Sequence, residues 1–381
     1  MRRRQGLTLT AVALAMACAG SASAQSVLDS ELRLAPQFLR YRLAQPGNAT
    51  ISQLAVPLFV SVPLGERLTF DVGTSYASSK VVSGTTTSDI SGLTDTQVRG
   101  NLTLGSDFIV LTAGFNLPTG KSSVTPEQFA AAGLIGNDFL AFPISNMGTG
   151  LAFTGGVAVA RPVGDWNVGV GGAVRQSAAY EPFAVPDGTL RFQPGNEYRA
   201  RVGVDRPTGT GRVALGLTYS TFGADDAGGS VYNTGDRVIA QGVYSAQSGG
   251  RGVTLAAYNV FRAPGSYASG DPAGRENIAN VAMAMGFVAL GSLVEPSIEL
   301  RHWLQNVPGF TSGTVTTPAR TQASMLATVA MRTRVSLGGL RLFPSAGYTL
   351  GSFATADAVG APAMAQLTGF RAAVAVRVLE P

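Results

Sequence analysis

Cysteine and histidine are almost absent from this chain of 381 residues. The single cysteine, Cys18, lies in the N-terminal apolar segment, where a lipoprotein-processing site is the weaker of two interpretations. Without Cys18 the chain has no disulfide bond and no thiol chemistry. His302 is the only histidine, and no serine or aspartate lies at a supporting position nearby in the sequence. These shortages predict that the protein is not an enzyme, unless an adjacent strand supplies the missing catalytic partners.

Long apolar runs are also missing beyond the N-terminus. Residues 2–4 are arginines, residues 7–17 form an apolar run, and residues 22–24 are small, which together predict a secretory signal peptide over 1–24. No later stretch reaches the roughly 18 uninterrupted apolar residues that a transmembrane helix needs. If the chain crosses a membrane, it must therefore cross with strands.

Lysine is also scarce, because only Lys80 and Lys121 accompany the arginines. Without the predicted signal peptide, 25 basic residues face 23 acidic ones, which indicates no partner nucleic acid. The arginines reflect either genome composition or a surface of planar cations that suits carboxylates and phosphates. The acidic residues lack the spacing of a calcium loop, and we expect neither a metal nor another cofactor.

Strict alternation is what the chain does have. Glu197, Arg199 and Arg201 alternate with apolar neighbours, and after a turn at 208–209 the same pattern continues to residue 222. A period of two residues, with one polar and one apolar face, predicts β-strands that separate water from lipid. Similar segments recur to the C-terminus. They begin near Ser30, Thr50, Arg67, Leu93, Asp107, Thr149, Trp166, Asn196, Arg212, Asp236, Gly252, Glu276, Ser292, Arg320, Leu340 and Ala365.

The connections between these segments alternate between tight glycine-rich turns and long loops. This parity predicts an all-β fold, a transmembrane antiparallel up-and-down β-barrel of about 16 strands, with turns in the periplasm and loops outside the cell. Residues 25–381 would form this single domain in the bacterial outer membrane. We expect the lipid bilayer, lipopolysaccharide, the barrel assembly machinery and small-molecule solutes as partners, and the oligomeric state stays open.

If the apolar phase faces lipid, the other phase lines a polar and charged lumen. The predicted lumen-lining residues are Arg99, Arg175, Arg199, Arg201, Glu299, Arg301, Arg332, Arg334 and Arg371. An interior this polar is hard to fill without water, and a barrel of about 16 strands is wide enough for an aqueous channel.

The longest loop, residues 118–148, contains the signals of a short helix. Thr125 and Pro126 are typical of the N-cap and first position of a short helix. If this loop folds inward as a constriction, Glu127 and Asp138 would face a cluster of wall arginines such as Arg99, Arg175, Arg199 and Arg201. If it covers the mouth as a lid instead, it would pack through its many apolar residues. The sequence leaves both readings open.

The aromatic residues support one further prediction and the prolines another. Trp303 and Tyr348 are among the aromatics expected in a girdle on the outer surface near the loop end. The mid-strand prolines predict bulges or kinks, including a slip of phase near Pro36, because proline cannot donate to a β-ladder. An interrupted strand that opens a lateral exit from the lumen is the functional alternative.

Two segments resemble a known family. They are Ser91-Gly92-Leu93-Thr94-Asp95-Thr96 and Leu111-Thr112-Ala113-Gly114-Phe115-Asn116-Leu117-Pro118-Thr119-Gly120-Lys121. They resemble signatures of outer-membrane transporters of the meta-pathway phenol-degradation type, which are distantly similar to long-chain fatty-acid transporters. The resemblance implies uptake of small hydrophobic or aromatic compounds.

The sequence is therefore compatible with three functions. The polar, arginine-rich lumen predicts a channel for passive diffusion of small solutes. The resemblance implies a transporter of hydrophobic or aromatic compounds. A lumen closed by salt bridges between arginines and acids would make a non-conducting structural barrel.

Overall fold

A computed structural model describes residues 31–44, 48–105, 108–185, 188–267, 273–289, 291–312, 315–317, 319–356 and 362–378. The predicted signal peptide lies outside these residues. Among the residues described, no helix is long and apolar enough to cross a membrane.

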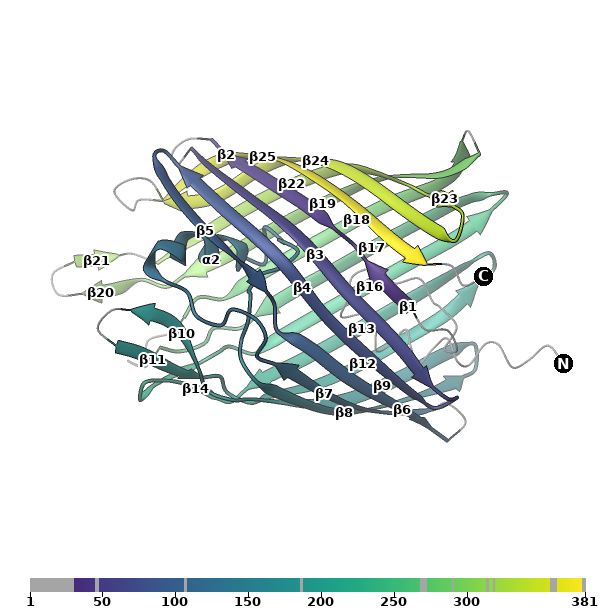
Figure 1. Cartoon of the computed structure of the whole chain (residues 1–381), viewed down its shortest axis with the longest axis horizontal. Coiled ribbons are helices and arrows are strands. Elements are labelled where there is room, and N and C mark those ends of the chain that lie inside the picture. The colour runs from purple at the N-terminus through teal and green to yellow at the C-terminus, as the bar shows by residue number, and fades with distance from the viewer. Residues whose placement is uncertain are drawn as a thin grey trace.

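The described strands form a closed barrel of 16 antiparallel strands, three of them assigned in two parts (Figure 1). The first half of the wall contains β1 (Glu31–Leu34) with β2 (Gln37–Leu43), β3 (Ala49–Leu64), β4 (Leu68–Ser83), β5 (Thr86–Leu93) with β6 (Thr96–Leu104), β7 (Ile109–Leu117), β8 (Ala152–Val163), β9 (Trp166–Ser177) and β12 (Glu197–Thr208). The second half contains β13 (Gly211–Phe222), β16 (Arg237–Ser248), β17 (Arg251–Arg262), β18 (Glu276–Ala289), β19 (Ser292–Val307), β22 (Arg320–Thr333) with β23 (Val335–Leu337), β24 (Leu340–Ala356) and β25 (Pro362–Val378). β25 pairs with β1 and β2, which closes the wall.

Alternation of side chains sorts the two faces as the sequence predicts. In the β12–β13 hairpin, Tyr198 and Leu217 are exposed on the apolar outer face, whereas Glu197 and Asp205 are buried on the inner face. Closure satisfies the backbone hydrogen bonds of the wall, which is the condition for strands to cross lipid. The predicted all-β barrel is confirmed, and the protein is located in the bacterial outer membrane.

Turns and loops segregate to opposite ends of the barrel. Tight turns at one end place glycines at positive φ, as at Gly65 (76°) and Gly209 (54°), where a side chain would be strained. At the other end of the barrel, more of the connecting residues form β-strands than expected. Residues 80–92, predicted as a loop, instead continue the β4–β5 hairpin. Short strands also form in three longer connections, β10 (Tyr180–Val185) with β11 (Gly188–Gln193), β14 (Ala224–Ala227) with β15 (Ser230–Asn233), and β20 (Phe310–Ser312) with β21 (Val315–Thr317).

The mid-strand prolines do not shift the pairing of the wall. They are Pro36, Pro57, Pro296 and Pro344. Arg33 pairs with Arg377 before Pro36, and Gln37 pairs with Ala373 after it, so both strands advance by the same number of residues. The predicted slip at Pro36 is wrong, because the proline ends β1 without adding a residue to the register.

Candidate functional site: the inward loop and the lumen beside it

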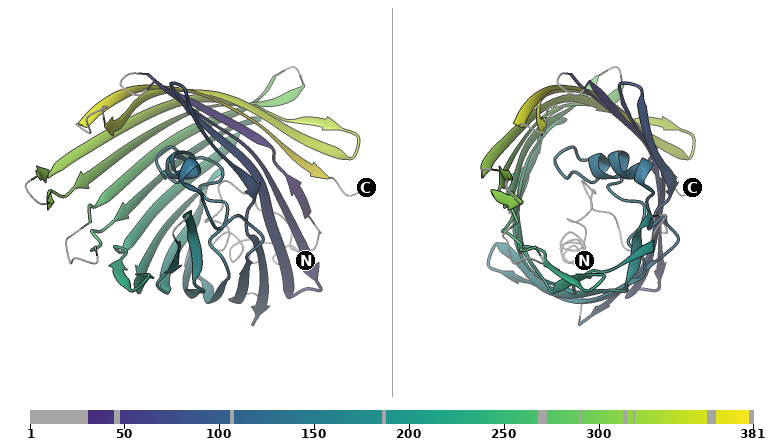
Figure 2. Two further views of the ribbon diagram at one scale, coloured as in Figure 1. Left: turned by 60° about the vertical axis from the view of Figure 1, so that its left-hand side comes forward. Right: turned by 90° about the vertical axis from the view of Figure 1, so that its left-hand side faces the viewer.

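The connection between β7 and β8 folds into the barrel, and we call residues 118–151 the inward loop (Figure 2). It contains a 3₁₀ turn, η1 (Pro126–Gln128), followed by α2 (Phe129–Ile135). Thr125 is the N-cap, and its backbone N–H donates to the Gln128 side chain over 3.2 Å, one half of a capping box. The predicted helix start is therefore confirmed, and the loop lies against the inner wall of the barrel.

Asp95 ties both ends of the inward loop to the wall. Its carboxylate accepts hydrogen bonds from the backbone N–H of Gly120 (3.1 Å) near the start of the loop and of Thr149 (2.6 Å) near its end. The Asn116 side chain donates a third bond of 2.8 Å to the same carboxylate. Bonds to an ionised acceptor are stronger than neutral ones, so this single buried side chain anchors the loop.

The two segments that carry the family resemblance meet at this anchor. The register of β4 changes between Tyr76–Leu93 and Gly73–Gln97, so Asp95 lies in a bulge between β5 and β6. A Cβ at Gly120 would overlap the backbone of the opposing segment, which explains why glycine is needed there. Both motifs therefore have a structural task in this chain, which is to dock the inward loop.

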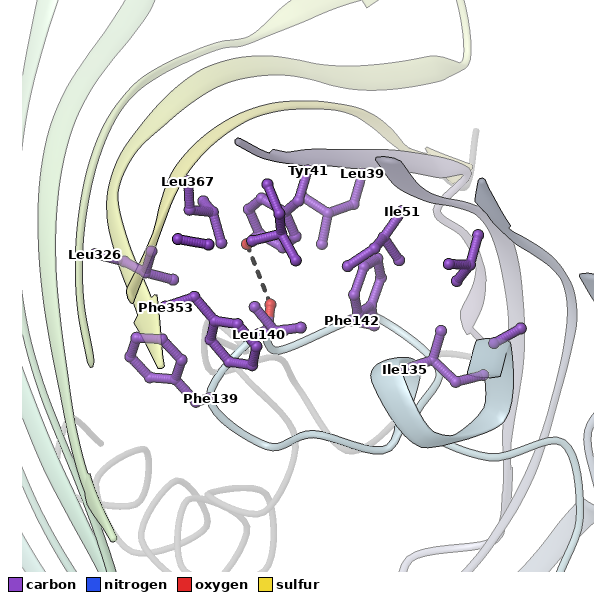
Figure 3. Close-up of a cluster of buried hydrophobic side chains, with 14 of the residues drawn as sticks. Leu39, Tyr41, Ile51, Ile135, Phe139, Leu140, Phe142, Leu326, Phe353 and Leu367 are labelled. Atoms are coloured by element: carbon purple, nitrogen blue, oxygen red, sulfur yellow. Dashed lines mark hydrogen bonds between the residues drawn. The ribbon is translucent and has the colours of Figure 1, made fainter. Parts of the chain in front are cut away.

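Apolar side chains fill the space between the inward loop and one side of the wall (Figure 3). Phe139 is fully buried and stacks on Trp303 and Phe353, with ring centroids 5.7 and 6.1 Å away. Phe142 meets Tyr41 edge-on at 5.5 Å. The expected place of Trp303 in the outer aromatic girdle is wrong, because its ring points inward against the loop. Tyr348, in contrast, is exposed on the outer face.

Polar contacts fix the backbone of the inward loop at the same side. The fully buried Gln53 side chain donates to the Ile144 carbonyl (2.8 Å) and accepts from the Ile144 N–H (2.9 Å). Arg301 donates to the Phe139 carbonyl over 2.8 Å, and Tyr41 donates to the Leu140 carbonyl over 3.1 Å. These bonds satisfy loop groups that are removed from water.

Predicted lumen residues on this covered side form one charged network. Arg301 pairs with Glu299 at 2.5 Å, and Arg371 lies 3.4 Å from the other carboxylate oxygen of Glu299. The Arg301 and Glu299 side chains are only 12% and 18% exposed. Arg301 and Glu299 are thus compensated and largely shielded by the loop, whereas the Arg371 side chain is 42% exposed.

Predicted lumen residues on the opposite side of the wall are more exposed than Arg301 and Glu299. Arg99 pairs with Asp71 at 2.8 Å and Arg199 pairs with Glu197 at 2.8 Å, with the two arginine side chains 40% and 35% exposed. The Arg175 side chain makes no hydrogen bond or ion pair with any described residue, although its backbone pairs with β8 and β12. Arg201 follows Arg199 on the same inner face of β12.

The last two predicted arginines lie at the turn end of the barrel. Arg332 pairs with Glu295 at 2.6 Å, and Arg334 is exposed between β22 and β23. Neither residue lies near the inward loop.

The predicted constriction acids occupy different places from those expected. Asp138 lies 3.7 Å from Arg262 instead of near Arg99, Arg175, Arg199 or Arg201. Glu127 is exposed at η1, where a hydrogen bond with Thr125 lowers the pKa of its carboxyl group. Of the two acids, only Asp138 makes an ion pair with the described wall.

Sequence reasoning missed Asp95 as an anchor, Gln53 as a clamp and Arg262 as the partner of Asp138. Asp95 belongs to a motif that stands out in the sequence, so a structural role was detectable there. Nothing local marks Gln53 or Arg262, since their partners are distant in the chain.

No family model and no curated protein matches the sequence. Solved structures with a similar fold include outer-membrane expressed OmpT of Vibrio cholerae, with 10% identity, 94% of this chain and 99% of that chain covered, and a TM-score of 0.43. An outer membrane channel from Pseudomonas putida F1 is 12% identical over 93% of this chain and 98% of that chain, with a TM-score of 0.38. The CymD monoaromatic hydrocarbon channel is 9% identical over 93% and 89%, with a TM-score of 0.40. Likeness at this level concerns the fold alone.

Proposed function

We propose that this barrel is an outer-membrane channel for passive diffusion of small solutes. The observation that carries the proposal is the unequal filling of the lumen. The inward loop packs against one side, and between residues 143–149 of the loop and the wall formed by β3, β4, β6, β7 and β9 lies a cavity of about 420 Å³. Its lining includes Gln97, Asn116 and Arg175 beside apolar residues such as Phe59 and Ile144, so polar and charged groups border the remaining path. Polar lining of this kind favours hydrated solutes.

Transport of hydrophobic or aromatic compounds has weaker support in the geometry. The residues behind the family resemblance hold the inward loop through Asp95 and Gly120. The largest aromatic group, Phe139 with Trp303 and Phe353, is occupied by its own stacking. In the described wall, adjacent strands remain paired across the mid-strand prolines, which does not favour a lateral exit.

A liposome-swelling assay tests the proposal. Refolded protein in liposomes should admit small polar solutes at rates that fall with solute size, because an aqueous path selects by diameter. If liposomes that contain the correctly folded barrel shrink and do not swell again in any polar solute, passive diffusion is contradicted. Entry of monoaromatic hydrocarbons alone would favour the hydrophobic alternative.

A further inference from the structure

One niche in the open side of the wall is built differently from the remainder of the lumen. It has a volume of about 240 Å³ and lies across β6, β7, β8, β9 and β12. Its inward-facing lining consists of Gln97, Arg99, Thr112, Gly114, Asn116, Thr154, Ala173, Arg175, Glu197 and Arg199. Three guanidinium groups thus border a single recess.

Small residues make room between these cations. Gly114 lies opposite Arg99 in the β6–β7 pair, and Ala173 lies opposite Arg199 in the β9–β12 pair. Thr154 separates them on β8, opposite both Gly114 and Arg175. The recess therefore has a floor without long side chains and a rim of arginines.

The charges of the niche do not balance. Asp71 compensates Arg99, and Glu197 is shared between Arg199 and Arg237. Glu197 is the cross-strand neighbour of Arg175 in the β9–β12 pair, but no carboxylate of the described residues makes an ion pair with the Arg175 guanidinium. The nearby carboxylate of Asp95 is already occupied by two backbone N–H groups and Asn116. The niche thus keeps one guanidinium whose N–H donors are not paired with a carboxylate of the described residues.

Neutral polar groups accompany this cation. In the described part of the chain, the Gln97 amide and the Thr154 hydroxyl make no hydrogen bond to another residue. An amide offers both donors and an acceptor, and a hydroxyl offers the same on a smaller scale. Together with a planar guanidinium, which matches a carboxylate with two parallel bonds, they suit an anion that also carries hydroxyl groups.

From this geometry we infer that the niche is a binding site for a small hydroxylated carboxylate, centred on Arg175. Gln97, Asn116 and Arg175 also border the cavity beside the inward loop, so the site lies on the narrowed path. The inference rests on the proposed channel function and adds a substrate class to it. Solutes of this class would bind weakly as they pass, whereas neutral polyols of equal size would not.

Gluconate and its neutral counterpart glucitol are the probes that test the site. Single-channel current in KCl is recorded while either probe is added, and the same titration is followed by calorimetry on the folded barrel in detergent. Arg175→Gln removes the guanidinium that has no direct ion-pair partner among the described residues. Arg251→Gln removes an equal charge at the first residue of β17, at the turn end of the barrel, and serves as the matched control.

Gluconate should reduce the chloride current of the wild type and of R251Q at the same half-blocking concentration. In R175Q this concentration should rise about tenfold, which corresponds to about 1.4 kcal/mol. Glucitol should have no specific effect. Equal block in all three proteins, or equal block by glucitol, would overturn the inference while leaving the channel intact. If no protein conducts, the proposed function fails, and calorimetry decides the site: binding heat lost in R175Q supports it, and no heat in the wild type overturns it.

Discussion

The two sides of the lumen contain the same residue types, but these residues differ in their pairing and in their exposure to water. On the covered side, Glu299 and Arg301 are shielded by the inward loop and bonded to each other and to the loop backbone. On the open side, Arg99 and Arg199 keep more than a third of their side-chain surface exposed, and the Arg175 guanidinium makes no ion pair with a described residue. Arginine is therefore a structural clamp on Glu299 and the loop backbone at Arg301, and a partly exposed cation at Arg99 and Arg199.

Position relative to the inward loop, and not residue type, decides between these two roles. Buried ion pairs need close partners because desolvation is costly, whereas exposed arginines tolerate incomplete pairing. The inward loop is the element that divides the lumen into a covered and an open side. Each of the following predictions changes the loop or one of these two sides.

Removal of the inward loop should have the largest effect. Replacing residues 124–146 by a short glycine-serine linker should raise single-channel conductance several-fold, since the covered side would become part of the path. Shortening the β14–β15 hairpin, which leaves the inward loop intact, should change conductance little. Equal conductance with and without residues 124–146 would show that the loop does not narrow the channel.

Loss of the Phe139 ring should release the loop from the covered side. Phe139→Ala should destabilise the docked loop by about 3–5 kcal/mol, because a fully buried aromatic side chain is removed. Hydrogen exchange of the loop amides should accelerate accordingly. Phe129, 42% exposed, is the matched control, and F129A should accelerate exchange far less. Unchanged protection in F139A would remove the stacked cluster from the account.

Neutralisation of Asp95 should loosen both ends of the loop. Asp95→Asn weakens acceptance of the Gly120 and Thr149 N–H bonds, each a bond to a charged group worth roughly 1.5–3 kcal/mol. We expect faster exchange at both loop ends and noisier channel currents. Asp89→Asn, on the β5 hairpin and without such bonds, should behave as wild type. If D95N and D89N are indistinguishable, Asp95 is not the anchor.

Reversal of charge on the open side should have the smallest effect, confined to selectivity. The double variant Arg199→Glu and Arg201→Glu should shift the reversal potential in a salt gradient towards cations, because a positive lumen attracts anions. Arg332→Glu with Arg334→Glu makes the same change at the turn end and should shift it less. A reversal potential unchanged by R199E and R201E would place these residues outside the narrow part of the path.

Much of the fold is predictable from the sequence because each strand carries its own signal. The alternation in 196–222 predicts the β12–β13 hairpin, which pairs from Glu197–Phe222 to Thr208–Gly211. Thr125 and Pro126 predict a helix start for the same reason, since capping is local. Proline was less informative, because Pro36 interrupts a strand without changing its register.

The candidate site was less predictable because it depends on contacts between distant segments. Trp303 shares the polar phase of Glu299 and Arg301, so its inward direction was available in the sequence, yet its aromatic type suggested the outer girdle. Asp138 faces Arg262 because of how the loop folds, and no spacing encodes that pair.

Single-channel recording of the refolded protein in a planar bilayer tests the central claim most directly. A lumen that stays open beside the inward loop should give stable ohmic steps, with a reversal potential on the anion side in a salt gradient. A folded barrel that inserts and remains silent would contradict the account, because the open side of the lumen would then be closed.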